Sequence, residues 1–383
     1  MIQPQLEILV IAALTASACA LLGVFLILRK MAMISDAIGH SILPGIVIGF
    51  FITQDLNSPL LIFLAALSGI VTVLLVEYLQ KTQLVKEDTA IGLVFPVLFS
   101  IGIILISKNA ADIHLDIDAV LLGELAFAPF DRIEINSVDM GPKSAWTIGS
   151  ILFLVITFII LFFKELKIST FDAGLAATLG FSPTLIHYSL MSLSSITIVG
   201  AFDAVGAILV VALIIAPAAS AYLLTENLKK MIGLSIGIGI FAAISGYWMA
   251  HFLDASIAGS IATVLGLFFF LTYLLAPRKG LIALTHSRKK QKREVSLITL
   301  LLHLSRHEEQ EERHTNHLQE HINWKEQHAK TILHMALDNG LIKIEDNIIS
   351  LTAHGAQFAE KSLKYILSNR SDKLNTFEEK QLP

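Results

Sequence analysis

Cysteine is almost missing from this chain, which has one such residue, Cys19, in 383 positions. A single cysteine cannot close a disulfide within the chain, so a fold held by internal disulfides is excluded. Cys19 lies in an apolar segment, where a small buried side chain is favoured over a reactive thiol.

Signature motifs of common enzyme classes are also missing. The sequence has no GxxxxGK[ST] segment, so it cannot form the usual phosphate-binding loop of an ATPase. It has neither HExxH, the zinc motif of many metalloproteases, nor CxxC. We therefore expect a protein that is not an enzyme.

Charged residues are scarce, at 16% of the chain, whereas 54% of the residues are hydrophobic. The apolar residues form long unbroken stretches before residue 280, and the charges gather after it. Stretches of about 17 to 25 apolar residues are long enough to cross a bilayer as helices. The chain has nine such stretches, at about 6–28, 31–53, 59–80, 89–107, 145–163, 184–201, 204–224, 231–251 and 256–276.

The loops between these stretches alternate in their content of cations, as the positive-inside rule requires. The cation-rich loops contain Arg29 and Lys30, Lys81 and Lys86, Lys164 and Lys167, Lys229 and Lys230, and Arg278 and Lys279. With these loops in the cytoplasm, nine spans place the N-terminus outside and a C-terminal domain inside.

An acid and a histidine lie four residues apart within the second apolar stretch. A charged side chain near the bilayer centre costs about 2.5–3.5 kcal/mol, so Asp36 and His40 should face a partner, water or a passing ion. Their spacing puts both on one helix face, and their oxygen and nitrogen donors suit divalent zinc, manganese and iron. A purely structural polar contact is the alternative. Pro44 and Gly45 follow closely, and they predict either a broken helix with free carbonyls or a simple packing kink.

The segment STFDAGLAATLGFSP, between the fifth and sixth spans, is too short to cross the membrane. Ser169, Thr170 or Asp172 can cap a helix start, and Gly180 can end the helix, which predicts eight to ten helical residues. Because this helix carries little charge, it suits docking into a groove of another protein. An ordinary connector on the membrane surface is the alternative. The candidate docking residues are Phe171, Asp172, Ala173, Gly174, Leu175 and Gly180.

The connection 108–144 is long and rich in acids. An acidic outer face would raise the local cation concentration, but a solvated loop that merely follows the topology explains the acids equally well.

These segments together resemble the metal-transporting permease family of ABC importers over about residues 5–282. The most specific blocks are SDAIGHSILPGI at 35–46, KEDTAIGLVF at 86–95, FDAGLAATLG at 171–180, AVGAILVVALIIAPAASAYLLT at 204–225 and LAPRKGLI at 275–282. The resemblance implies a dimeric core in the bacterial cytoplasmic (inner) membrane, formed with an identical or paralogous second permease subunit. It also implies separate ATP-binding subunits and an extracytoplasmic metal-binding protein. It identifies 171–180 as the helix that couples to the ATPase, and Asp36 and His40 as residues that contact the ion in transit.

The last hundred residues differ in composition from the rest. After a basic linker at 283–293, a helix-rich pattern with two short strands around Asp346 and Asn347 indicates a winged-helix-like domain at 294–370, followed by a disordered tail at 371–383. The expected helices are 294–306, 311–321, 324–338 and 355–369. This part resembles metal-dependent repressors. Its candidate recognition helix is poor in unpaired cations, so a regulatory or interaction role is favoured over DNA binding.

Histidines are dense in this C-terminal part. Pairs at i,i+4 can share one metal ion, which predicts a cytoplasmic metal sensor. Scattered solvated histidines are the alternative. The candidate ligands are His303, His307, His317 and His321.

The sequence thus predicts an all-α polytopic membrane protein of about nine transmembrane helices with a small C-terminal α+β domain. The expected function is a permease subunit for divalent metal ions (manganese or zinc, with iron as a third candidate). We expect no permanently bound cofactor, with the metal as substrate and ATP only on the partner subunit. A metal-responsive membrane-anchored regulator and an ion-coupled secondary metal transporter are the alternatives.

Overall fold

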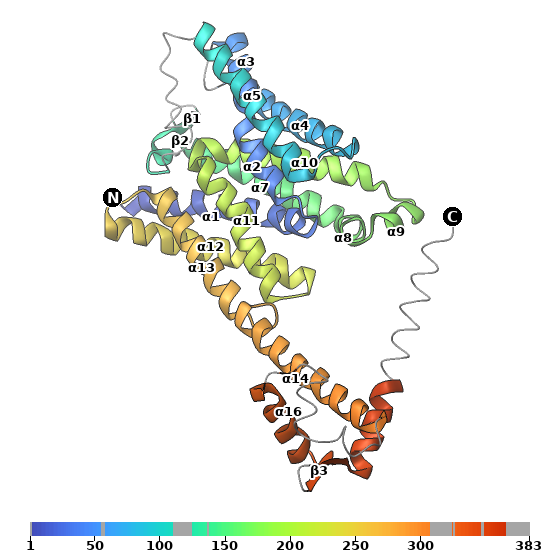
Figure 1. The fold of residues 1–383 in the computed structure, drawn as a ribbon. Coiled ribbons are helices and arrows are strands. Elements are labelled where there is room, and N and C mark those ends of the chain that lie inside the picture. The colour runs from blue at the N-terminus through green and yellow to red at the C-terminus, as the bar shows by residue number, and fades with distance from the viewer. Residues whose placement is uncertain are drawn as a thin grey trace. The chain divides into compact units, whose positions relative to one another are not determined.

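The computed structural model divides the chain into two compact units, an N-terminal unit of Met1–Leu281 and a C-terminal unit of Ile282–Pro383 (Figure 1). Each unit is described by itself. The structure describes residues 2–54, 58–109, 125–135, 138–306, 324, 326–345 and 348–364.

Long apolar helices make up most of the N-terminal unit. In the described residues, nine helical segments are long and apolar enough to span a membrane, which confirms the predicted number. Helices suit apolar surroundings because they satisfy every backbone hydrogen-bonding group within the segment. The spans are formed by α1 (Ile2–Leu28), α2 (Ala32–Ser41) with α3 (Leu43–Thr53), α4 (Pro59–Lys81), α5 (Glu87–Asn109), α7 (Lys143–Leu161), α10 (Pro183–Val205), α11 (Ala207–Leu224), α12 (Leu228–Leu253) and α13 (Ile257–Leu275).

Helix α1 is central to the N-terminal unit and packs against α11 and α12 (Figure 1). In the most apolar part of α1, 72% of the residues are buried, compared with 22% in α5 and in α7. Small residues allow this close packing: a Cβ at Gly23 would lie 2.0 Å from the carbonyl oxygen of Ile214 on α11. The exposed faces of α5 and α7 are therefore the ones available to lipid or to another subunit.

A short β-hairpin follows the connection after α5. Strands β1 (Arg132–Ile135) and β2 (Val138–Pro142) pair antiparallel after a 3-10 turn, Ala128–Phe130. The acidic composition of the connection did not predict this hairpin, although the alternation in RIEI is typical of a strand. Most of the expected acids of this connection lie outside the described residues.

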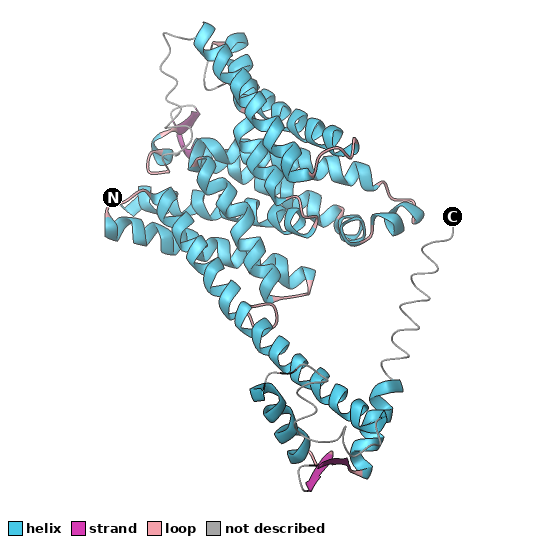
Figure 2. Cartoon of the chain, in the orientation of Figure 1, coloured by secondary structure: helices cyan, strands magenta, loops and turns pink. Residues whose placement is uncertain are grey.

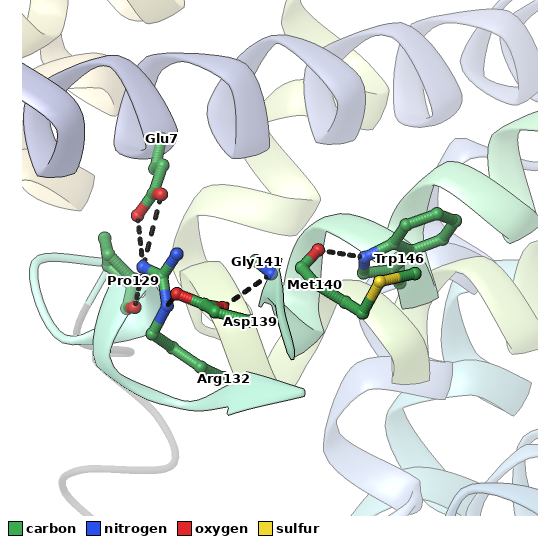
Figure 3. A network of polar contacts seen from close by, with 7 residues as sticks. All are labelled: Glu7, Pro129, Arg132, Asp139, Met140, Gly141 and Trp146. Carbon is green, nitrogen blue, oxygen red and sulfur yellow. Dashed lines mark hydrogen bonds and ion pairs between the residues drawn. The ribbon is translucent and has the colours of Figure 1, made fainter. Parts of the chain in front are cut away.

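One arginine ties this hairpin to the first helix, as Figure 3 shows. Arg132 donates through Nη1 to Glu7 Oε2 on α1 at 3.0 Å and through Nε to Asp139 Oδ2 on β2 at 2.6 Å. The backbone N–H of Gly141 and the Arg132 guanidinium together hold the pKa of Asp139 below its usual range. The hairpin is thus connected to α1 by charge-assisted hydrogen bonds.

Between α7 and α10 lie two short helices, α8 (Phe163–Phe171) and α9 (Ala173–Thr178). Asp172 caps α9, because its Oδ1 accepts a hydrogen bond from Leu175 N at 2.9 Å. The expected eight to ten helical residues are wrong. Helix α9 has six residues, since the extended backbone of Asp172 separates it from α8.

The C-terminal unit has a small core of its own. Helices α14 (Leu281–Arg306) and α16 (Glu326–Asp338) contribute to it, as do the antiparallel strands β3 (Ile342–Glu345) and β4 (Ile348–Leu351) (Figure 2). A further helix covers 353–364. The fully buried residues include Leu300, Ile332 and Ile349.

The described part of the C-terminal unit follows the predicted order of helix, helix, hairpin and helix. The basic segment 283–293 lies inside α14. The expected helix at 311–321 and the tail at 371–383 lie outside the described residues, and the winged-helix assignment stays a prediction.

Candidate functional site

The second span is interrupted beside the predicted acid and histidine. Helix α2 ends at Ser41 and α3 begins at Leu43, so a single residue, Ile42, separates them. Pro44 in the first turn of α3 has no N–H, and the carbonyl of His40 therefore cannot accept the usual bond from the residue four positions later. Of the two alternatives that Pro44 and Gly45 left open, the structure has an interruption of one residue, at which the backbone of Ile42 stays in the α region.

Asp36 and His40 meet on one face of α2, as their spacing predicts. His40 Nε2 lies 3.6 Å from Asp36 Oδ1. The ring of Phe95 on α5 packs against the imidazole, with the ring centroids 5.7 Å apart. The side chains of His40 and Asp36 are 37% and 40% exposed in the single chain. Both are accessible to an ion or to a second subunit.

Neighbouring helices hold the interruption in place. Ser68 Oγ on α4 donates to the Ser41 carbonyl at 2.6 Å, and Thr72 Oγ1 donates to Ser41 Oγ at 2.5 Å. On the other side of the break, a Cβ at Gly45 would lie only 2.3 Å from the Leu64 carbonyl oxygen. Helix α4 therefore supports the break with hydrogen bonds and by direct backbone contact.

As a candidate metal site, this position is incomplete in one chain. Zinc and manganese need about four to six ligands, and the pair offers one carboxylate and one imidazole beside a freed carbonyl. In the described part of the chain, no group of three or more His, Cys, Asp or Glu side chains could hold a metal ion. Further ligands have to come from water or from another subunit.

The predicted docking segment presents an apolar surface. Phe171, Leu175 and Leu179 are 62%, 50% and 55% exposed, whereas Ala176 is fully buried. Gly180 ends α9 with φ +84°, a left-handed conformation that favours glycine. The surface lies at one end of the N-terminal unit and carries the residues that sequence analysis selected.

The predicted histidine site of the C-terminal unit is not assembled by the described residues. His303 lies on α14. His307, His317 and His321 lie outside the described residues. This site stays a prediction.

Sequence analysis missed one polar cluster between α4 and α10. The carboxylate of Glu77 is hydrogen-bonded to His187 Nε2, and Tyr188 Oη donates to Glu77 Oε2 at 2.7 Å. No local spacing in the sequence connects Glu77 with His187, because they are 110 positions apart. The cluster satisfies its own charges, which favours a structural role.

Comparisons with known proteins identify similar chains. The chain is 45% identical over 362 residues to the zinc transport system membrane protein TroD of Treponema pallidum, covering 94% of this chain and 98% of that protein. It is 44% identical over 269 residues to the manganese transport system membrane protein MntD of Bacillus subtilis, covering 70% of this chain and 91% of that protein.

Solved structures show the same fold. The structure of PsaBC from Streptococcus pneumoniae in complex with Fab matches with a TM-score of 0.60 and 29% identity, over 73% of this chain and 94% of that chain. A putative metal-chelate type ABC transporter in an inward-facing conformation matches with a TM-score of 0.52 and 19% identity, over 70% and 86% of the two chains, which shows the fold alone. A model of the ABC 3 transport family covers residues 2–276, and the chain belongs to this family.

Proposed function

We propose that this chain is the membrane permease subunit of an ABC importer for divalent metal ions, manganese or zinc, with iron as a third candidate. The observation that carries the proposal is the Asp36 and His40 pair, 3.6 Å apart beside a break in a membrane helix. Oxygen and nitrogen donors next to a freed carbonyl suit a metal ion better than an organic solute. The family consists of transport proteins rather than enzymes.

The names of the relatives support a metal substrate. TroD is named for zinc, MntD for manganese, and a relative from Haemophilus influenzae, 28% identical over 285 residues, for iron transport. These metals share the ligand types that the pair offers. Family membership favours ATP-driven import over an ion-coupled secondary transporter, and nine spans exceed what an anchored regulator needs.

The transporter is assembled from several polypeptides. A second permease subunit related by a two-fold axis would bring two carboxylates and two imidazoles together and complete the site. A separate ATP-binding subunit docks on the apolar surface around α9, and an extracytoplasmic metal-binding protein delivers the ion. The cation-rich loops support an orientation with the N-terminus outside and the C-terminal unit in the cytoplasm.

The C-terminal unit serves a regulatory or interaction role in this proposal. Its order of elements supports a winged-helix-like domain, and its match within the 362 residues aligned to TroD indicates that one relative carries the same extension. On α16 the cation Lys330 is paired with Glu326 at 2.7 Å, which disfavours DNA as the partner.

Uptake of manganese and zinc by the permease assembled with its ATP-binding subunit tests the proposal. We expect Asp36→Asn and His40→Gln each to lower uptake about tenfold or more, because loss of supporting contacts alone weakens metal sites by about 10–100-fold. The metal that the native complex accumulates identifies the substrate.

A matched control removes a carboxylate elsewhere in the N-terminal unit. Asp254 ends α12 with φ +51°, a conformation that asparagine adopts readily, so Asp254→Asn should leave uptake unchanged. If uptake by Asp36→Asn and His40→Gln equals that of the control at matched membrane levels, the pair has only a structural role.

A further inference from the structure

Arg29 connects two distant parts of the N-terminal unit. Its Nη2 donates to Ser169 Oγ at 2.8 Å and its Nε donates to Thr170 Oγ1 at 3.1 Å. The donors and acceptors are 140 and 141 positions apart in sequence. One planar guanidinium thus holds two hydroxyl groups at once, a geometry that lysine cannot reproduce.

At one end of this contact, Arg29 lies in the tight turn between α1 and α2. Met31 N donates to the Leu26 carbonyl at 2.9 Å, and Lys30 N donates to the Ile27 carbonyl at 3.0 Å, while Lys30 has φ +63°. These two bonds form a Schellman motif, which fixes the direction of the chain after a helix. Helix α2 starts at Ala32, directly after this stiff turn, and carries Asp36.

At the other end, Ser169 and Thr170 belong to the last turn of α8. Asp172 follows them and caps α9, whose apolar side is the proposed docking surface. Helix α8 is held to the body of the unit by Leu166, which is fully buried. A displacement of α9 therefore acts directly on the two hydroxyl groups that Arg29 binds.

The surroundings of Arg29 distinguish it from the neighbouring cation. Arg29 is half-buried, and its burial lowers the pKa of the guanidinium from its ordinary value. Lys30 carries the same charge in the same turn but is exposed. A desolvated charge-assisted hydrogen bond is stronger than a surface contact. The hydrogen bonds of Arg29 can therefore couple the movement of α8 to the turn between α1 and α2.

We propose that Arg29 is a positioning residue that couples the docking helix α9 to the ion-site helix α2. This inference rests on the proposed function of the chain as an ATP-driven metal permease. When the ATP-binding subunit moves α9, the guanidinium passes the movement to the turn before α2 and so to Asp36 and His40. Without the hydrogen bonds of Arg29, ATP hydrolysis continues but no longer reorients the ion site.

The test uses the full permease assembled with its ATP-binding subunit in proteoliposomes, with ATP hydrolysis and manganese or zinc uptake measured on the same sample. Arg29→Gln and Lys30→Gln remove the same charge from the same turn and form a matched pair. We expect Arg29→Gln to keep hydrolysing ATP while metal uptake per ATP falls about tenfold, within the range typical of coupling between two sites. Lys30→Gln should keep the native metal uptake per ATP.

A second variant tests the same contact from its other side, in case Arg29→Gln does not fold. The double substitution Ser169→Ala with Thr170→Val removes both acceptors and leaves the arginine in place. We expect the same fall in uptake per ATP, and no further fall when it is combined with Arg29→Gln, because all three side chains act through one contact.

Four outcomes would overturn the inference. If Arg29→Gln keeps the native uptake per ATP, or if uptake per ATP falls equally in Lys30→Gln, the hydrogen bonds of Arg29 do not couple the two helices. Uptake and hydrolysis that fall in proportion would indicate a structural role alone. A native complex that hydrolyses ATP without moving manganese or zinc would instead refute the proposed function, and the inference with it.

Discussion

Glu77 obtains its two partners from a helix more than a hundred positions later in the chain. Its carboxylate binds His187 and Tyr188 on α10, and the side chains of Glu77 and His187 are only 14% and 19% exposed. A buried charge that loses its partners costs more than the hydrogen bonds themselves contribute. The cluster therefore fixes α10 against α4.

Glu77→Ala should destabilise the N-terminal unit by about 1–3 kcal/mol, because it leaves the buried polar groups of His187 and Tyr188 without their acceptor. Tyr188→Phe, which removes one hydroxyl, should cost less. Thermal unfolding of the purified permease in detergent measures both. Equal melting temperatures for Glu77→Ala and the native chain would contradict the structural role.

His328 gives the C-terminal unit a dependence on pH. It contacts Ser296 Oγ at 2.9 Å, and desolvation, followed by the charges of Lys292 and Arg293, lowers its pKa. A histidine with a lowered pKa in the folded state takes up its proton more readily when unfolded. The contribution of His328 to the stability of this unit is therefore fully present above the ordinary pKa of about 6.5 and falls as the pH drops towards the lowered folded value.

Amide hydrogen exchange over α16 in the full chain, corrected for the intrinsic effect of pH, checks this prediction. Protection should fall between pH 7.5 and pH 5.5 in the native chain, and the fall should be smaller in His328→Gln. Identical pH dependence in the two chains would show that another group is responsible.

At the residue scale, sequence analysis found the contacts that lie within one helix. The spacing of Asp36 and His40 predicts their approach, because side chains four positions apart share a helix face. The contacts of Glu77 with His187 and of Arg29 with Ser169 depend on how separate helices pack. A single sequence contains no spacing that shows this packing.

The break between α2 and α3 depends on helix α4, whose backbone lies against Gly45. Gly45 allows the backbone of α4 to approach, and any larger side chain would collide with the Leu64 carbonyl. Proline next to this glycine removes a helix hydrogen bond, so the interruption has both a chemical and a steric cause.

Gly45→Ala should lower the melting temperature and the amount of folded permease, because backbone atoms cannot yield as a flexible side chain can. Gly237→Ala on α12 is the matched control, since a Cβ there meets no atom within 4 Å. The control should be neutral or slightly stabilising, by up to about 1 kcal/mol from helix propensity. Equal melting temperatures in the two variants would contradict the close approach at Gly45.

The cap of α9 offers a test of the docking surface. Asp172→Ala removes the acceptor for Leu175 N and should cost the helix about 0.5–2 kcal/mol, whereas Asp172→Asn keeps a capping oxygen. We expect Asp172→Ala to reduce the ATP-binding subunit that purifies with the permease, and Asp172→Asn to retain it. Equal recovery of the subunit with both variants would place the docking surface elsewhere.

At the scale of elements, helix existence was more predictable than helix length. Apolar runs indicate where a span lies because only a helix satisfies the backbone in lipid. The length of α9 depends on the extended backbone of Asp172, which an acidic capping residue permits but does not require. The hairpin of β1 and β2 was missed because its strands are short and its acids suggested a solvated loop.

The relatives differ in how much of the chain they match. MntD matches over 269 residues, which cover 91% of that protein. The remaining part of MntD is too short for a counterpart of the C-terminal unit. TroD matches over 362 residues and therefore extends into that unit. A relative named for manganese transport is therefore too short to match both units of this chain.

A chain of residues 1–281 should import metal at a rate close to that of the full chain, and it should continue to do so when cytoplasmic metal is high. A deletion of residues 365–383 is the matched control and should behave as the full chain at every metal concentration. Uptake at low and high metal, at equal membrane levels, measures both effects. Loss of uptake at low metal in the 1–281 chain would assign the C-terminal unit to transport itself.

At the scale of the whole molecule, composition predicts the division of the chain, because apolar and charged residues require different solvents. The assembly is less predictable from one chain, since the proposed ion site and the proposed docking surface would each need other polypeptides to be complete. The half-exposed Asp36 and the exposed Leu175 are the observations that support this proposal.

Cys19 is fully buried among the helices that surround α1. Thiol reagents in water do not react with a cysteine in such surroundings, so the native chain already serves as an unlabelled background. Cysteines introduced at the exposed positions Lys30 and Leu179 would therefore carry spectroscopic probes at those two places alone. The separation between the α1–α2 turn and the end of α9 could then be followed through a cycle of ATP hydrolysis without first replacing a native residue.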